Sequence, residues 1–134
     1  MRSTPTGILA RRRRPRVARD RCCDVSSERG RIGEDLAWEH LRERGYRLIG
    51  RNVRVPGGEI DIVCSDGATI VFVEVKTRSS HTFGPAIAAV DERKRRKLRS
   101  LAADYLQFAA PGSRARFDIV TVEGTAVAHY RSAF

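Results

Sequence analysis

Three acidic residues and a lysine lie within the two otherwise apolar runs on either side of the turn in residues 58–78, GEIDIVCSDGATIVFVEVKTR. Two runs rich in β-branched residues flank Asp66-Gly67, a dipeptide typical of a hairpin turn. The charged side chains within these runs are Glu59, Asp61, Glu74 and Lys76. Carboxylates on neighbouring strands can hold a hard divalent cation, and a lysine beside them adds a second positive charge. The pattern therefore predicts a metal site on a β-hairpin.

The turn also predicts a strand register. Centring it on Asp66-Gly67 places Glu59 opposite Glu74, with Asp61 as a diagonal neighbour. Opposed Cβ atoms lie about 4.5–5.5 Å apart and diagonal ones about 7–8 Å, so Asp61 and Glu74 can converge on one ion. For a single residue the alternative is a solvated face with surface ion pairs. The apolar run at 71–75 instead favours a central strand, where a carboxylate is costly unless it is paired or binds metal.

Composition limits the kind of protein this is. The 134 residues suit one domain, and 26 basic against 16 acidic residues give a formal net charge of +10, which favours a polyanionic partner such as nucleic acid. No apolar run approaches the roughly 20 residues of a membrane span, so no membrane partner is expected. The three cysteines show neither a disulfide framework nor zinc-ligand spacing, and no secretory signal is recognised. A cytoplasmic location is expected.

The chain divides into two parts by pattern. Residues 1–26 contain eight arginines against two aspartates and few apolar residues, which predicts a disordered tail. That tail either has no role or binds phosphates without sequence preference. Periodic apolar spacing begins afterwards, so residues 27–134 are expected to form the folded domain.

The expected elements follow the order αβββαββ, which indicates an α/β or α+β sheet flanked by helices. They are a helix at 27–44, an extended segment at 46–55, the hairpin, a loop at 77–90, a helix at 91–108, and strands within 115–122 and 126–134. Glu34 falls on the inward stripe of the first helix. Lys94 shares a stripe with Leu98 and Leu101, so it should point toward the sheet, and Phe108 is expected in the core.

Several of these motifs resemble the YraN family of uncharacterised bacterial proteins. They are Gly33-Glu34, Arg51-Asn52, GEIDIV at 58–63, VFVEVKTR at 71–78, the helix start from Val90 to Lys94, and RFDIV at 116–120. The family is assigned to the restriction-endonuclease-like fold, whose PD-(D/E)XK pattern resembles Asp61 followed by Glu74-Val75-Lys76. Here Ile60 stands where that pattern has proline.

The resemblance implies a role for each matching residue. Asp61, Glu74 and the Val75 carbonyl would bind Mg²⁺ or Mn²⁺, with Glu59 close by. Lys76 would orient or activate the attacking water, and Glu34 would be the helix carboxylate seen in junction-resolving relatives. Basic residues expected to contact nucleic acid are Arg78, Arg93, Lys94 and Lys97.

Two functions from different classes fit the sequence. The first is a metal-dependent nuclease acting on nucleic acid, with DNA favoured, for which a homodimer would supply one site for each strand of a duplex. The second is a nucleic-acid-binding or assembly protein that keeps the fold without turnover. Such a protein would bind without metal, and its affinity would fall steeply with salt.

Overall fold

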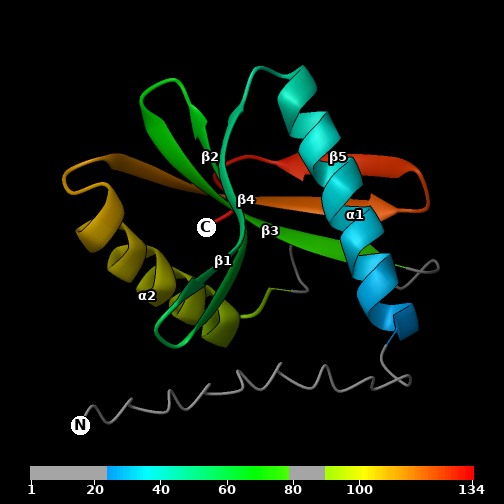
Figure 1. The fold of residues 1–134 in the computed structure, drawn as a ribbon, viewed down its shortest axis with the longest axis horizontal. Helices are drawn as coiled ribbons and strands as arrows, with labels where there is room; N and C mark the ends of the chain where they lie inside the picture. Colours follow the sequence, from blue (N-terminus) through cyan, green and yellow to red (C-terminus); the bar gives the residue numbers. More distant parts are fainter. Residues whose placement is uncertain (1–23, 79–89) are drawn as a thin grey trace, which may run out of the picture.

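The structure, a computed structural model, describes residues 24–78 and 90–134. The predicted tail lies outside the described residues up to position 23, as do residues 79–89 of the predicted loop. Two helices and five strands are present (Figure 1): α1 (Asp24–Glu43), β1 (Arg47–Val55), β2 (Gly58–Asp66), β3 (Thr69–Arg78), α2 (Glu92–Ala109), β4 (Arg114–Glu123) and β5 (Ala126–Tyr130). The predicted mixed α/β architecture and its order αβββαββ are confirmed.

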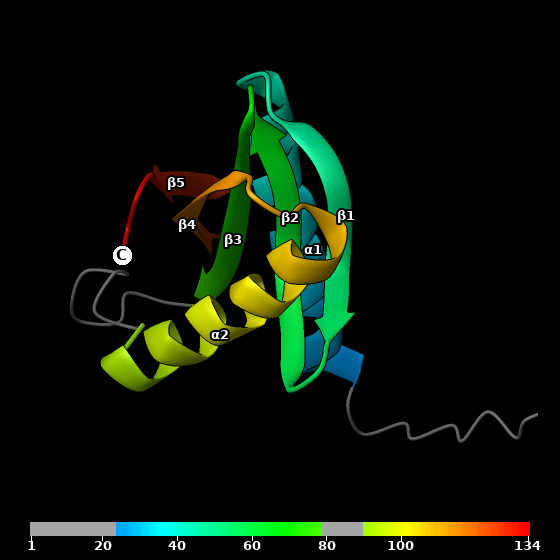
Figure 2. The same cartoon turned by 90° about the vertical axis from the view of Figure 1, so that its left-hand side faces the viewer.

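The strands form one sheet in the order β1-β2-β3-β4-β5. Only β3 and β4 run parallel among these strands, and α2 lies between them in the chain, as a parallel crossover requires. Successive side chains of a strand point to opposite faces. Val71 and Val73 pack in the cluster that contains Ala37 of α1, whereas Phe72 packs with Leu101 of α2. The helices therefore cover opposite faces of the sheet, as Figure 2 shows.

Both helices begin and end close to the predicted positions. The first starts at Asp24, three residues earlier than expected, and Gly45 follows it with φ of +88°, a left-handed C-terminal cap that glycine adopts readily. The second has Asp91 as its N-cap, whose side chain accepts a hydrogen bond from the Lys94 N–H at 2.8 Å. Among the described elements, neither helix is long and apolar enough to cross a membrane.

The expectation that Phe108 is a core residue is wrong, because its exposed fraction is 80%. Burial falls along the apolar stripe of α2, from buried Leu98 and Leu101 to half-buried Tyr105. The helix thus leaves the sheet within its last turn, in which Leu106 still packs against the cluster of Ile60 and Phe72. A position on the stripe predicts burial only while the helix still covers the strands.

The hairpin register differs from the prediction by two residues. Asp66 pairs with Thr69 and Cys64 with Val71, so the turn is Gly67-Ala68, with Gly67 at φ +58°. A left-handed residue suits the first position of such a turn, and glycine adopts it without steric cost. The shift keeps Ile62 and Cys64 on the same face as Val71 and Val73, as an even shift must. Ile60 instead packs with Phe72 on the other face, so the alternation of β2 is broken between Ile60 and Ile62. The predicted opposition of Glu59 and Glu74 is also wrong, since Ile62 pairs with Val73 and this register brings Asp61, rather than Glu59, next to Glu74. On the other side of β2, Glu59 pairs with Arg54 of β1.

Candidate metal-binding site

The candidate site lies where β2 and β3 separate. Their paired residues run from Asp66 and Thr69 to Ile62 and Val73, and the next side chains along the strands are those of Asp61 and Glu74. Asp61 Oδ2 accepts a hydrogen bond from the Val75 N–H at 2.9 Å. A side-chain oxygen thus satisfies a strand N–H that would otherwise need a backbone partner. This contact fixes the Asp61 carboxylate beside the strand that carries Glu74.

Glu74 is buried, with an exposed fraction of 6%, and its carboxylate is paired with two lysines. Lys76 Nζ and Lys94 Nζ each lie 3.2 Å from Glu74 Oε1. Lys94 comes from α2 and points toward the sheet, as its place on the apolar stripe indicates. A carboxylate this deeply buried is stable only with such compensation.

Glu34 approaches the same region from α1, held by two residues of β1. Asn52 Nδ2 donates to Glu34 Oε2 at 3.0 Å, and Arg51 places NH2 3.7 Å from the same oxygen and 2.7 Å from Asp35 Oδ1. Asn52 has φ of +49°, a conformation that asparagine tolerates better than most residues. The Arg51-Asn52 pair has no evident role in the sequence, because the backbone conformation that directs the Asn52 amide to Glu34 is not visible in a sequence pattern.

The electrostatics single out Asp61. Burial raises the pKa of its carboxyl to about 7, with further contributions from the charges of Glu74 and Glu34, against the opposing effects of the Val75 N–H and Lys94. Glu74 has two lysine partners and Glu34 has Arg51, whereas Asp61 has no ion-pair partner among the described residues. Asp61 is therefore the carboxylate of this cluster that lacks a compensating cation.

The donor set fits a hard divalent ion that keeps most of its waters. Asp61 and Glu74 could supply oxygen ligands from adjacent strands, and Mg²⁺ commonly binds proteins through one or two carboxylates. Within residues 24–78 and 90–134, no group of three Asp, Glu, His or Cys side chains is arranged to hold an ion by itself. An ion here would therefore be held by two carboxylates and completed by water, a backbone carbonyl or a substrate oxygen.

The remaining predicted site residues lie around this cluster. Glu59 is exposed and its carboxylate lies 3.6 Å from Arg54 Nε, so the structure gives it a partner outside the cluster. Val75 contacts Asp61 through its N–H, and a role for its carbonyl stays a prediction. Arg93 and Lys97 are exposed on α2, and half-buried Arg78 is the last residue of β3.

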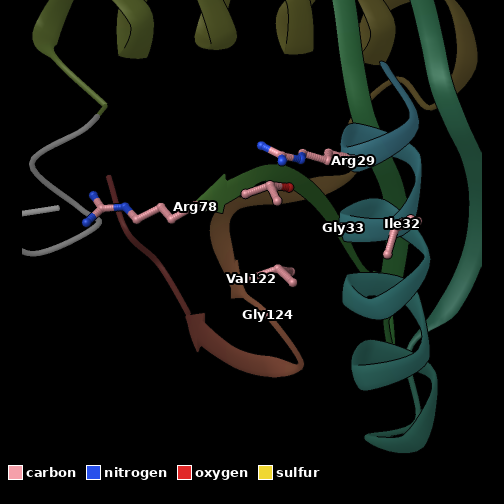
Figure 3. A pocket seen from close by; sticks show the side chains of 7 residues that line it. Arg29, Ile32, Gly33, Arg78, Val122 and Gly124 are labelled. Carbon is pink, nitrogen blue, oxygen red and sulfur yellow. The ribbon is translucent and has the colours of Figure 1, made fainter. Parts of the chain in front are cut away.

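One glycine of α1 allows the close approach of the helix that brings Glu34 near the strands. Gly33 is buried against Thr77 of β3, and both line a pocket of about 270 Å³ between α1 and the ends of β3 and β4 (Figure 3). Arg29 of α1 and Arg78 of β3 are both among the residues that line this pocket. In the sequence Gly33 is only one residue of the Gly33-Glu34 motif. The structure explains the glycine by its contact with Thr77.

Replacing Gly33 with alanine is expected to destabilise the protein by about 1–3 kcal/mol through overpacking. The new Cβ would clash with Thr77 Oγ1 and lie 3.3 Å from Thr77 Cβ, and a β-branched side chain has few alternative rotamers. Gly30 is the matched control, since no described atom lies within 4 Å of a Cβ there, and alanine should stabilise the helix by up to about 1 kcal/mol. Urea denaturation measures both. Equal effects at the two positions would contradict the role given to Gly33.

The fold and the site define a mixed α/β protein with paired carboxylates and lysines at a gap in its central sheet. The chain belongs to the uncharacterised protein family UPF0102, whose model matches residues 33–122, and the resemblance to the YraN family is thereby confirmed. It is 54% identical over 95 residues to a UPF0102 protein of Moorella thermoacetica, covering 70% of this chain and 79% of the relative. A relative from Dechloromonas aromatica is 42% identical over 111 residues, covering 83% and 92%.

Proposed function

We propose that the protein is a metal-dependent nuclease that hydrolyses phosphodiester bonds in nucleic acid, with DNA as the favoured substrate. The observation that carries the proposal is the Asp61 carboxylate, which lies beside Glu74 without a compensating cation. A half-buried acid in that position is unfavourable unless it is protonated or meets a positive ion. The spacing of Asp61, Glu74 and Lys76 along the hairpin resembles the PD-(D/E)XK nucleases, and the mixed sheet agrees with that resemblance.

In this proposal Asp61 and Glu74 hold a Mg²⁺ or Mn²⁺ ion. The bound ion would lower the pKa of a water molecule and offset negative charge on the phosphate. Without an ion, Lys76 and Lys94 neutralise the Glu74 carboxylate. When Glu74 binds an ion, the two lysines could turn toward a phosphate of the substrate. Glu34 is held by a hydrogen bond from Asn52 and lies close enough to Asp61 for its charge to act on that carboxyl. From this position it would orient a water molecule.

Basic residues near the site support nucleic acid as the substrate. Arg93 and Lys97 are exposed on the same helix as Lys94, and Arg78 ends the strand that carries Glu74. The formal net charge of +10 attracts a polyanion over a distance of about one Debye length. These positions are suited to phosphate contacts, which add affinity without sequence preference.

Glu74→Gln is expected to reduce cleavage by about 100-fold or more, because it removes the charge of one metal ligand. Supercoiled, four-way-branched and single-stranded DNA, each with Mg²⁺ or Mn²⁺, are the substrates to use. Glu39→Gln is the matched control, since Glu39 is exposed on α1 and pairs only with Arg42 among the described residues. If the wild type cuts and Glu74→Gln cuts equally well, Glu74 does not belong to a nuclease site.

A non-catalytic nucleic-acid-binding protein is the second candidate. It is favoured by the two lysines that already neutralise Glu74 and by the lack of a three-ligand cluster within the described residues. This candidate predicts binding to DNA that persists in EDTA and weakens steeply with salt. A calorimetric Mn²⁺ titration separates the two, since only the nuclease proposal predicts binding that Glu74→Gln removes.

A further inference from the structure

A second polar pocket lies on the α1 face of the sheet, whereas Glu74 meets α2 on the other face. Its volume is about 470 Å³. The polar residues that line it come from the end of α1, the ends of β2 and β5, and the residue before β1, and they are His40, Arg44, Tyr46, Asp66, His129 and Arg131. Five of these six side chains can donate hydrogen bonds, and none belongs to the candidate metal site.

A buried carboxylate, Asp118, does not line this pocket but contacts His129, which does. Asp118, with an exposed fraction of 1%, accepts hydrogen bonds from Arg116 Nε at 2.9 Å and the Ser132 N–H at 3.0 Å, and it lies 2.8 Å from His129 Nε2. Burial raises the pKa of Asp118, but these hydrogen bonds together bring it below its ordinary value. We therefore assign the hydrogen to His129 Nε2, which donates it to Asp118 Oδ2.

The phenol of Tyr46 offers an unused donor in the same place. Tyr46 is 7% exposed, and its hydroxyl oxygen accepts a hydrogen bond from Arg116 NH2 at 2.8 Å. The hydroxyl hydrogen has no acceptor among the described residues, although a buried donor normally has one. Burial raises the pKa of Tyr46, so this hydroxyl keeps its hydrogen at neutral pH.

The charges around the pocket favour an anion. The single carboxylate, Asp66, lies 3.0 Å from Arg116 NH1 and 3.2 Å from Arg131 NH2, so its charge is compensated. Arg44 donates to the His40 carbonyl at 3.1 Å and has no acidic partner among the described residues. Burial, and then the charges of Arg44 and His129, lower the pKa of His40. Positive charge thus exceeds negative charge here, and a bound anion would balance it.

We propose that this pocket binds a phosphate monoester group, either of a free nucleotide or of the phosphorylated end of a nucleic-acid strand. A terminal phosphate presents three oxygens and close to two negative charges, which suits donors that approach from α1, β5 and Tyr46 together. A phosphodiester inside a strand presents two free oxygens and one charge, so it uses fewer of these donors. The volume also exceeds that of phosphate alone and leaves room for an attached sugar.

The test is a titration of the full chain in EDTA, followed by amide chemical shifts in NMR spectra. The probes are inorganic phosphate, AMP, and one DNA oligonucleotide with and without a 5′-phosphate. If the phosphate group alone is recognised, phosphate and AMP should cause saturable chemical-shift changes at residues 40–46 and 127–131. If the strand end is required, only the phosphorylated oligonucleotide should cause them. Arg131→Gln and His40→Gln should each weaken that binding about tenfold or more.

Arg42→Gln is the matched control for Arg131→Gln, because it also removes one positive charge. Arg42 is exposed on α1, pairs with Glu39 and does not line this pocket. This substitution should leave the affinity for the phosphate probe unchanged. The proposal is overturned if no probe gives saturable shifts in this pocket, if the oligonucleotide without a 5′-phosphate shifts these residues as much as the phosphorylated one does, or if Arg42→Gln weakens binding as much as Arg131→Gln. Glu74→Gln should leave this binding intact, so loss of nuclease activity and loss of phosphate binding are separate outcomes.

Discussion

Asp61→Asn is expected to stabilise the metal-free protein and to remove its metal-dependent activity. Burial and the neighbouring charge of Glu74 raise the pKa of Asp61 to about 7, so the ionised form is unfavourable in the folded state. Asparagine keeps an oxygen for the Val75 N–H and carries no charge. We expect a gain of about 1–3 kcal/mol in the free energy of unfolding at pH 8 in EDTA. Cleavage should fall by about 100-fold or more, because a metal ligand is lost.

The pH dependence of this gain has a defined sign. Between the unfolded pKa near 4 and the folded pKa of about 7, the folded protein binds more protons at Asp61 than the unfolded chain does. This acid therefore makes wild-type stability fall as pH rises from about 4 to about 7. The advantage of Asp61→Asn should be small near pH 4, grow through that interval and level off above pH 7. Urea denaturation in EDTA at several pH values measures it.

Glu59→Gln is the control for this measurement. Glu59 lies two residues away on the same strand, but it is exposed and pairs with Arg54. Its replacement should change stability by at most about 1 kcal/mol, without the rise between pH 4 and pH 7. Adding Mn²⁺ should narrow the gap between wild type and Asp61→Asn, because an ion that binds the folded wild type stabilises it. If the difference in free energy of unfolding between wild type and Asp61→Asn depended on neither pH nor Mn²⁺, Asp61 would not be the uncompensated acid.

Much of the fold could be predicted because its signals are local. Alternating apolar residues indicated the strands, and the helical stripe of α2 indicated that Lys94 points toward the sheet, where it meets Glu74. The hairpin itself followed from Asp66-Gly67, but its register did not. Either Asp66-Gly67 or Gly67-Ala68 can form a two-residue turn, and local propensity alone does not choose between them.

Other parts of the site depend on tertiary contacts that leave little trace in a sequence. Asn52 holds Glu34 only because its backbone is left-handed, and Gly33 is needed only because Thr77 packs against it. Asp118 pairs with Arg116, two residues away on the same strand, but its contact with His129 joins β4 to β5, whose register the sequence does not give. Phe108 shows the same limit, since the point at which α2 leaves the sheet is set by the whole fold.

Asp118→Asn is expected to lower the free energy of unfolding by about 3 kcal/mol at neutral pH, a large fraction of the stability of a small domain. The buried carboxylate accepts from Arg116 and the Ser132 N–H and contacts His129. Asparagine would turn an NH₂ group toward one of these donors and would leave the Arg116 charge, which is largely buried, without its closest partner. Asp35→Asn, at an exposed position paired with Arg51, should cost no more than about 1 kcal/mol.

The pH dependence of this loss is opposite in sign to that of Asp61. The pKa of Asp118 is below its ordinary value, because the hydrogen bonds from His129, Arg116 and Ser132 together outweigh the burial that would raise it. Its contribution to stability is thus fully present above the unfolded pKa of about 4 and is lost as pH falls through the folded pKa. The free energies of unfolding of wild type and Asp118→Asn, measured by urea denaturation, should differ by a constant amount from pH 5 to pH 8 and converge below about pH 4. If the gap instead widened on acidification, the ionised carboxylate would not be the state that Arg116 and His129 stabilise.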